Sequence, residues 1–388
     1  MRDVSFFDVD AGDLRLFEAL TSRTLTAAEV PLADEVSKKI PVYDMERQHA
    51  ALGDPAARRA LMSEWARVLK SLSGVVVLRR AFTDTAPIDR ATEVFDQIIA
   101  REKADTGGGA DHFAAAGAND RIWNSAQKLC LTDPEAFALY FGNPAIAAVC
   151  EAWLGPGYQM TAQVNLVRPG GQAQTAHRDY HLGFQTAEVA SRFPAHAHAL
   201  SAVMTLQGAV AHCDMPLETG PTKLLPFSQC FDAGYMAYRR QDFASLFEAR
   251  AVQLPLGKGD VVFFNPALFH AAGENRSTDI HRMANLLQVS SAFGRAMESL
   301  DREAMCRALF PVLGRLRASR GLEGAELNAA IAAAAEGYSF PTNLDTDPPT
   351  GGLAPETQAQ LLRRALDEGW SGADFEAALA TQRARKQA

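Results

Sequence analysis

Two histidines and one aspartate have the types and the spacing that a metal site requires. His177 and Asp179 lie two residues apart. In an extended segment such residues point to the same face, so the pair can present an imidazole and a carboxylate to one ion. The apolar stretch 261–264 reads as a buried strand that leads through a short turn to a third candidate ligand, His270. Two histidines and one carboxylate leave coordination positions open, which suits non-haem Fe(II) and its reactions with O2.

The residues after His270 argue against a chance arrangement. A His-x-Asp pair often occurs without metal, and a single histidine is more often a packed or surface residue than a ligand. Beyond a loop, however, the next strand carries Arg282 near its start. Arginine binds a carboxylate through two parallel hydrogen bonds, which suits the far end of a dicarboxylic acid that chelates the metal. A surface charge at a strand edge is the alternative for Arg282, and Arg276 in the turn is the competing candidate.

The ordered set of features resembles the phytanoyl-CoA dioxygenase family of Fe(II)/2-oxoglutarate-dependent oxygenases. The residues that match its metal and cosubstrate positions are His177, Asp179, His270 and Arg282. The segment around the second histidine of that family is matched by Gly273, Asn275 and Ser277. Residues 218–228 are similar to its mid-barrel segment, and the resemblance covers roughly residues 70 to 295. The His-x-Asp motif alone is unspecific, whereas the set in this order is specific.

The resemblance implies a mechanism and a set of cofactors. Fe(II) would be held by the two histidines and the aspartate, 2-oxoglutarate would take two positions through its keto acid end, and O2 would take the third. Succinate and CO2 would be released as a C–H bond of a small-molecule substrate is oxidised. Related halogenases lack the carboxylate ligand, so the retention of Asp179 favours hydroxylation over halogenation. Gln163 and Asn165 share one face of a strand and are candidates for bonds to 2-oxoglutarate, with ordinary strand polar residues as the alternative.

Other polar residues are weaker candidates. His181 shares the face of the motif if the strand continues that far, and a supporting or structural role is favoured over ligation. Structural or surface positions are expected for His196, His198 and His212. A place in the substrate pocket and a packing role are equally open for Trp123, Asn124 and Gln127. Many family members carry Pro-Gly-Ser-His where this chain has Pro226 to Gln229, which leaves the substrate class open, and an acyl-CoA substrate is not inferred.

Two further functions remain open at this point. One is a jelly-roll metalloprotein of another class, an isomerase or hydrolase that uses Zn or Mn. The other is a binding protein that has kept the site without turnover.

Composition excludes some classes of protein. The 388 residues are 47% hydrophobic and 22% charged, as in ordinary globular proteins, and the formal net charge of -8 argues against a general nucleic-acid binder. The first residues lack the pattern of a signal peptide, and no apolar run has the length of a membrane span. Five scattered cysteines without a Cys-x-x-Cys pair predict reduced thiols in a cytoplasmic protein. Nothing in the sequence predicts the oligomeric state.

Many short strands separated by Gly/Pro turns predict a mainly β fold with flanking helices, built on a double-stranded β-helix (jelly-roll, cupin-like) core. Strands are expected at 75–78, 158–167, 200–210 and 286–293. The domain prediction is an irregular N-terminal arm with some helix over 1–70, a jelly-roll core over 71–295 and a helical extension over 296–388 that packs on the core. The Gly-rich stretch 105–120 is expected to be a loop, either a passive connection or a mobile cover of the site. C-terminal helices are expected at 296–319, with a kink or break at Pro311, and at 325–335, 356–368 and 372–384.

Overall fold

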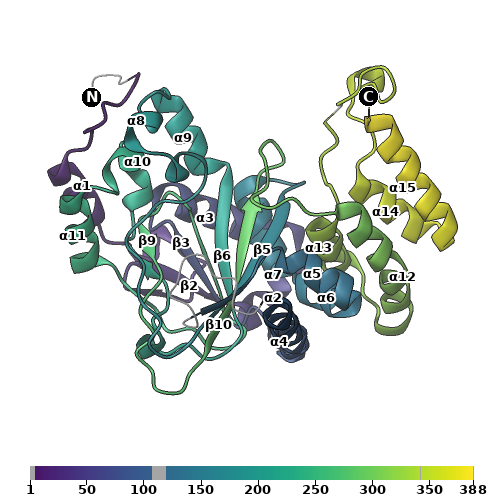
Figure 1. Ribbon diagram of the computed structural model, residues 1–388, viewed down its shortest axis with the longest axis horizontal. Coiled ribbons are helices and arrows are strands. Elements are labelled where there is room, and N and C mark those ends of the chain that lie inside the picture. Colours follow the sequence, from purple (N-terminus) through teal and green to yellow (C-terminus); the bar gives the residue numbers. More distant parts are fainter. Residues whose placement is uncertain (1–4, 107–118, 341, 388) are drawn as a thin grey trace.

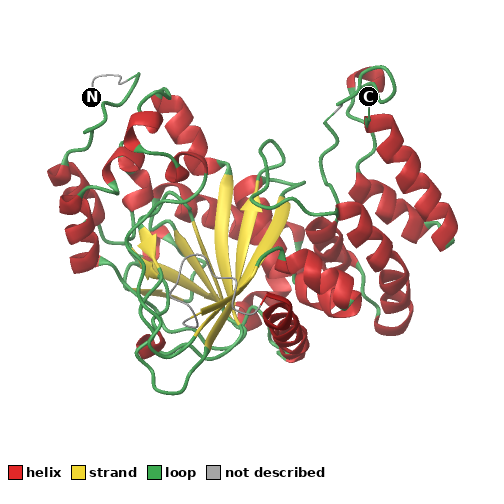
Figure 2. Cartoon of the chain, viewed as in Figure 1, coloured by secondary structure: helices red, strands yellow, loops and turns green. Residues whose placement is uncertain are grey.

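A large β-sheet forms the centre of the molecule in the computed structural model, which describes residues 5–106, 119–340 and 342–387. The strands run in the order β1-β2-β3-β8-β6-β10-β5-β4, and all neighbours are antiparallel except the parallel pair β2 and β3. Figure 2 shows these strands as a fan with helices on both sides. The strand bounds are β1 Glu35–Ser37, β2 Ile40–Asp44, β3 Val75–Arg79, β4 Asn119–Ile122, β5 Gln159–Val167, β6 Thr205–Ala211, β8 Val261–Phe264 and β10 Arg282–Ser290.

A second, smaller sheet carries part of the metal motif. Its strands β7 (Lys223–Leu224) and β9 (His270–Ala271) pair antiparallel, and single bridges add His177 beside β9 and Val252 beside β7. A large and a small sheet that enclose a cavity are the jelly-roll arrangement, so the predicted core is confirmed. The expectation of a mainly β protein with flanking helices understates the helical content, because the described residues contain 15 α-helices.

The apolar strand residues 75–78 show why the sheet is buried on both faces. Val76 and Leu78 pack in the main hydrophobic cluster with the helices, whereas Val75 and Val77 face the opposite cluster beside the cavity. Successive strand residues point to opposite faces, so a continuous apolar run is expected where both faces are covered. Helices that contribute buried side chains to the main cluster include α3 Pro55–Ser71, α4 Ala86–Thr106, α5 Ser125–Thr132, α6 Pro134–Phe141 and α7 Pro144–Leu154.

The N-terminal segment contributes strands as well as helices. β1 and β2 extend the large sheet beyond β3. In the chain these two strands lie between α1 (Leu14–Thr21) and α2 (Met45–Gly53). The irregular arm predicted here is therefore more regular than expected. The predicted strand over 200–210 is partly wrong, because α9 (Ala195–Val203) occupies its first residues and β6 only the rest. The remaining short helices are α8 Ala187–Ala190, α10 Gly234–Ala237 and α11 Gln241–Arg250.

The C-terminal helices form a group beside α5, α6 and α7 (Figure 1). Their bounds are α12 Arg302–Arg320, α13 Gly324–Ala334, α14 Gln358–Asp367 and α15 Gly372–Lys386. The helix α12 continues through Pro311 without the predicted break. Buried neighbours on both sides, Phe310 and Val312, offset the missing backbone hydrogen bond, and Phe310 stacks on Phe375 of α15 with ring centroids 4.4 Å apart.

Among the described residues no single helix has both the length and the apolar content to cross a membrane. α6 and α7 pass that test only together, as a pair bent by 63°, and both supply residues to the buried core. The division into segments 1–70, 71–295 and 296–388 stays a proposal.

Candidate metal centre

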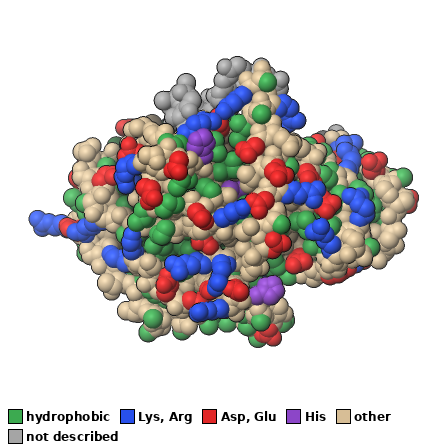
Figure 3. Space-filling view, turned by 90° about the horizontal axis from the view of Figure 1, so that it is seen from below, with side chains coloured by type: hydrophobic (Ala, Val, Ile, Leu, Met, Phe, Trp, Pro, Cys, Tyr) green, Lys and Arg blue, Asp and Glu red, His purple; other side chains and the backbone are tan. Residues whose placement is uncertain are grey.

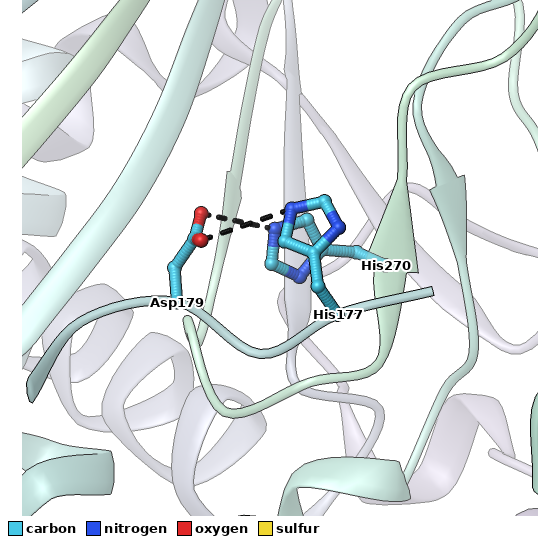
Figure 4. A group of neighbouring side chains, drawn as sticks. All are labelled: His177, Asp179 and His270. Carbon is cyan, nitrogen blue, oxygen red and sulfur yellow. Dashed lines mark ion pairs between the residues drawn. The ribbon is translucent and has the colours of Figure 1, made fainter. Parts of the chain in front are cut away.

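The three predicted ligands meet at one point between the two sheets (Figure 4). His177 and His270 face each other as an antiparallel bridge, in which each backbone N–H donates to the carbonyl of the other residue at 3.0 and 3.2 Å. The backbone N–H of Asp179 donates to the carbonyl of Pro266 at 3.1 Å. One ligand atom from each of the three side chains lies within 4.8 Å of the others. Main-chain pairing therefore brings together residues that are distant in the sequence.

Each imidazole is oriented by its own backbone. Nδ1 of His177 lies 2.9 Å from the carbonyl oxygen of Thr175, and Nδ1 of His270 lies 2.8 Å from that of Leu268. A carbonyl only accepts, so Nδ1 must carry the proton and Nε2 has its lone pair free. The two Nε2 atoms lie 3.8 and 3.4 Å from the carboxylate oxygens of Asp179. Burial and the neighbouring His270 lower the pKa of His177, which keeps its imidazole in the neutral form that metals bind.

Asp179 is held by a hydrogen-bonded chain of polar side chains. The amide of Gln207 on β6 donates to Oδ2 of Asp179 and also lies 3.3 Å from Oε1 of Gln288 on β10. The hydroxyl of Tyr180 donates to the same oxygen of Gln288. Burial alone would raise the pKa of Asp179, but the contacts with His270, His177 and Gln207 hold it below its ordinary value. The carboxylate is thus ionised and fixed in orientation.

A residue that the sequence reasoning missed lies between the ligands. Arg178 is almost fully buried and points away from the cavity, where its guanidinium donates to the carbonyls of Ser228 at 2.7 Å and Phe231 at 3.1 Å. Its Cζ lies over the rings of Tyr235 and Phe269 at 4.9 and 5.3 Å from their centroids. Burial lowers its pKa to about 10, so it stays charged at neutral pH. The alternation along an extended segment was the available signal, since a residue between two cavity-facing ligands must face the core.

The triad lines a cavity of about 760 Å³ between the sheets, and Arg282 lines it too. Arg282 is only 7% exposed, and its Nη1 donates to the carbonyls of Thr219 at 2.9 Å and Gly273 at 3.3 Å. No aspartate or glutamate of the described residues forms an ion pair with it. Burial lowers its pKa to about 10, so the cavity wall carries a buried positive charge. Arg276 is exposed and does not line the cavity.

The two polar residues of β5 also face the cavity. Gln163 and Asn165 pair with Leu286 and Ala284 of β10, and all four residues line the cavity. Oε1 of Gln163 accepts from Arg121 at 3.3 Å. Oδ1 of Asn165 is buried and has no hydrogen-bond partner among the described residues. A buried polar atom without a partner is costly, which marks Asn165 as a position where contact with a bound molecule is expected.

The weaker candidates are separated by the structure. Trp123 lines the cavity, whereas Asn124 and Gln127 are tied to the C-terminal segment, with the N–H of Asn124 donating to Glu298 and Oε1 of Gln127 accepting from the N–H of Asp301. His181 does not share the face of the motif, because the chain turns at Tyr180 with a positive φ of 63°.

The remaining candidates lie away from the cavity. His196 is exposed, and His198 and His212 are buried and bonded to protein groups. Gln229, at the departure from the family pattern, donates to the carbonyl of Leu72 at 2.8 Å. Most of the expected loop 105–120, namely residues 107–118, lies outside the described residues.

Comparison with known protein families gives a match that covers more than half of the chain. The sequence model described as Phytanoyl-CoA dioxygenase (PhyH) matches residues 71–284. No curated protein matches. Two similar solved structures come from nogalamycin biosynthesis. The α-ketoglutarate-dependent epimerase SnoN is 22% identical, with a TM-score of 0.42 over 62% of this chain and 82% of SnoN. The carbocyclase SnoK is 20% identical, with a TM-score of 0.45 over 61% of this chain and 86% of SnoK.

Proposed function

Because this chain belongs to the phytanoyl-CoA dioxygenase family of Fe(II)/2-oxoglutarate-dependent oxygenases, we propose that it hydroxylates a small molecule at a single iron. The proposed iron ligands are His177, Asp179 and His270. The observation that carries the proposal is the convergence of two oriented Nε2 atoms and one fixed carboxylate on a cavity. The same cavity holds a buried arginine that forms no ion pair with the described residues.

The donor set fits Fe(II). Two neutral imidazoles and one carboxylate on one side of an ion leave the other positions to the cavity, as in the facial triads of non-haem iron oxygenases. The bonds from each Nδ1 to the backbone, and from Gln207 to Asp179, are the supporting contacts that orient metal ligands. When bound, iron with 2-oxoglutarate and O2 supplies oxidative decarboxylation to succinate and CO2 together with oxidation of a C–H bond.

Arg282 is the proposed partner of the far carboxylate of 2-oxoglutarate. Its Nη1 is occupied by two backbone carbonyls. Nε and Nη2, which share the opposite edge of the planar guanidinium, have no acceptor among the described residues. Such an edge binds a carboxylate through two parallel hydrogen bonds. The buried charge would then be neutralised by the cosubstrate, and the side-chain NH2 groups of Asn165 and Gln163 are proposed to donate to its remaining oxygens.

Asp179 supports hydroxylation as the outcome. A carboxylate at this position occupies the place that a halide would need and supplies a negative charge to the ion. Its bond from Gln207 holds one oxygen and leaves the other directed at His177. The side chain therefore acts as a fixed ligand throughout turnover.

The test is a substrate screen with protein purified without oxygen. Fe(II), 2-oxoglutarate and O2 should yield succinate, and an added substrate should gain one oxygen atom that derives from O2. A product without an added oxygen atom would show that the enzyme catalyses another oxidation and not hydroxylation. Stimulation by Zn or Mn with no need for 2-oxoglutarate would favour the isomerase or hydrolase alternative, and cosubstrate binding without succinate for any substrate would favour a binding protein.

A further inference from the structure

The cavity contains more positive than negative side chains. Its described lining includes three arginines, Arg121, Arg239 and Arg282, but one carboxylate, Asp179. This excess is local, because the chain as a whole has a formal net charge of -8. On the face shown in Figure 3, acidic and basic side chains are interspersed. The charge of the cavity is thus a property of the site and not of the surface in general.

Arg239 is oriented by the protein but not neutralised by it. Its Nη2 donates to the carbonyls of Gly183 at 3.2 Å and Gln185 at 3.1 Å, and its Cζ lies 4.7 Å from the ring centroid of Tyr238. The Tyr238 hydroxyl donates to the same Gly183 carbonyl at 2.7 Å. No described aspartate or glutamate pairs with Arg239, and its Nη1 and Nε have no acceptor in the described chain. The guanidinium is therefore held in place, and its Nη1 and Nε groups can donate to a bound molecule.

The position of Arg239 places this charge beside the iron site. Its two carbonyl anchors flank Phe184, which lines the same cavity and is 57% exposed. These anchors follow Asp179 by only a few residues in the chain. Arg239 itself is exposed at the surface, so it lies where the cavity opens. A molecule entering the site would meet a cation and an aromatic ring together.

When iron and 2-oxoglutarate are bound, the charge of Arg239 is not needed to balance the other charges of the site. The charges of Fe(II), Arg282, Asp179 and 2-oxoglutarate together sum to zero. Arg121 contacts other protein groups through Trp123 and Gln163. The charge of Arg239 remains available, and an oriented guanidinium beside an apolar wall favours an anion that carries an apolar body.

We propose that Arg239 binds an anionic group of the substrate, a carboxylate or a phosphate, at the mouth of the cavity, so that the substrate is an organic acid with its reacting carbon over the iron. This inference rests on the proposed function for the position of the iron. It deepens that function by naming the substrate class.

The experiment measures binding of matched probes by calorimetry. Protein loaded with Fe(II) and saturating 2-oxoglutarate in the absence of oxygen is titrated with phenylacetate, 4-phenylbutyrate and octanoate, with their primary amides, and with phenyl phosphate. At least one anion should bind about 10-fold or more tightly than its neutral counterpart. Carboxylates and phenyl phosphate together decide which of the two anions is preferred.

Variants assign the binding to one residue. Arg239→Gln should weaken the anions about 10- to 100-fold and leave the amides unchanged, since only a charge-assisted hydrogen bond is lost. Arg192→Gln is the matched control, because Arg192 is exposed, lies outside the cavity and loses the same charge. Equal affinity for anions and amides, anion binding that survives Arg239→Gln, or no binding by any anion of the panel would overturn the proposal.

A second readout separates this inference from the proposed function. The visible absorption band that 2-oxoglutarate gives on chelating Fe(II) reports the iron site alone. Anion binding that depends on Arg239 in a protein without this band would refute the iron chemistry and keep the anion site. If the band appears but no anion binding depends on Arg239, the iron chemistry is kept and the anion site is refuted. Retention of anion binding in Arg282→Gln would show that the probes do not occupy the place of the cosubstrate.

Discussion

Gly234 leaves the space that the guanidinium of Arg178 fills, since a Cβ at Gly234 would lie 1.9 Å from Cζ of Arg178. Arg178 stands between two of the proposed ligands, and its guanidinium lies over Phe269, the residue before the third. One buried cation therefore contacts both ligand-bearing segments from the side away from the cavity. The packing around it fixes the spacing of the ligands.

Replacement of Gly234 by alanine should disturb this packing. We expect Gly234→Ala to lower the free energy of unfolding by about 1–3 kcal/mol, because the added methyl group forces Arg178 to move. Iron affinity should fall with it. Gly314→Ala in α12 is the control, since a Cβ there meets nothing within 4 Å. Urea midpoints and chelator competition measure both effects, and equal midpoints for the two variants would contradict the account.

Gln207 should tune the iron site without contacting the iron. In Gln207→Leu the carboxylate of Asp179 loses its donor, and we expect iron affinity to fall about 10- to 100-fold. Gln229→Leu removes another buried amide, one that bonds Leu72 outside the cavity. That control should lower stability and leave iron affinity unchanged. The same iron affinity in both variants would show that Gln207 does not influence the iron site.

The proposed roles of Asp179 and Arg282 predict different kinetic defects. Asp179→Ala should abolish hydroxylation and iron retention. Arg282→Ala should chiefly raise the 2-oxoglutarate concentration for half-maximal rate, by about 10- to 100-fold, since a two-bond ion pair is lost. Arg276→Ala, at the exposed competing position, should behave as the unaltered protein. Succinate release against cosubstrate concentration measures all three, and an unchanged Arg282→Ala would mean that another group binds the carboxylate.

His212 should make the fold sensitive to acid. It is buried between Thr92 and Tyr140 with 2.8 Å contacts at both ring nitrogens, and burial lowers its pKa to about 3. In the unfolded chain a histidine takes up a proton near pH 6.5, while the folded protein does not. The free energy of unfolding should therefore decrease as the pH falls from about 6.5 towards 3, by up to about 1.4 kcal/mol per pH unit.

Replacement of His212 separates this effect from other titrations. His212→Gln should be less stable at neutral pH, because buried hydrogen bonds are disturbed, yet its stability should fall less steeply with acid. His49→Gln, at an exposed histidine, should keep the original slope. Urea denaturation at a series of pH values gives the slopes. Parallel curves for the unaltered protein and His212→Gln would show that His212 contributes nothing.

The arrangement of the ligand side chains could be predicted because it depends on local rules. The alternation of an extended segment placed His177 and Asp179 together, and the strand before His270 ended where the apolar run ended. Their assignment as iron ligands stays a prediction until metal is measured. The jelly-roll core followed from many short strands and Gly/Pro turns. The helical content was underestimated, because the number of predicted strands says little about how many residues form the helices that cover them.

Long-range contacts and short strands could not be predicted from spacing. Pro41 argues against a strand, yet β2 tolerates it because the pairing of β2 with β3 begins only at Val42, so no β3 residue is paired with Pro41. Residues 200–203 are mostly apolar and fit either a helix or a strand, so the pattern did not separate α9 from β6. The contacts of Gln207 and Arg178 join segments that are distant in the chain, and no local signal names their partners.

The reciprocal main-chain bonds between His177 and His270 have a consequence for how iron is acquired. Small zinc domains fold only when their ion arrives, because nothing else unites their ligands. Here the polypeptide itself unites them, so loading becomes a reversible exchange with the surrounding metal supply. An iron ion that is lost or oxidised can therefore be replaced while the protein stays folded.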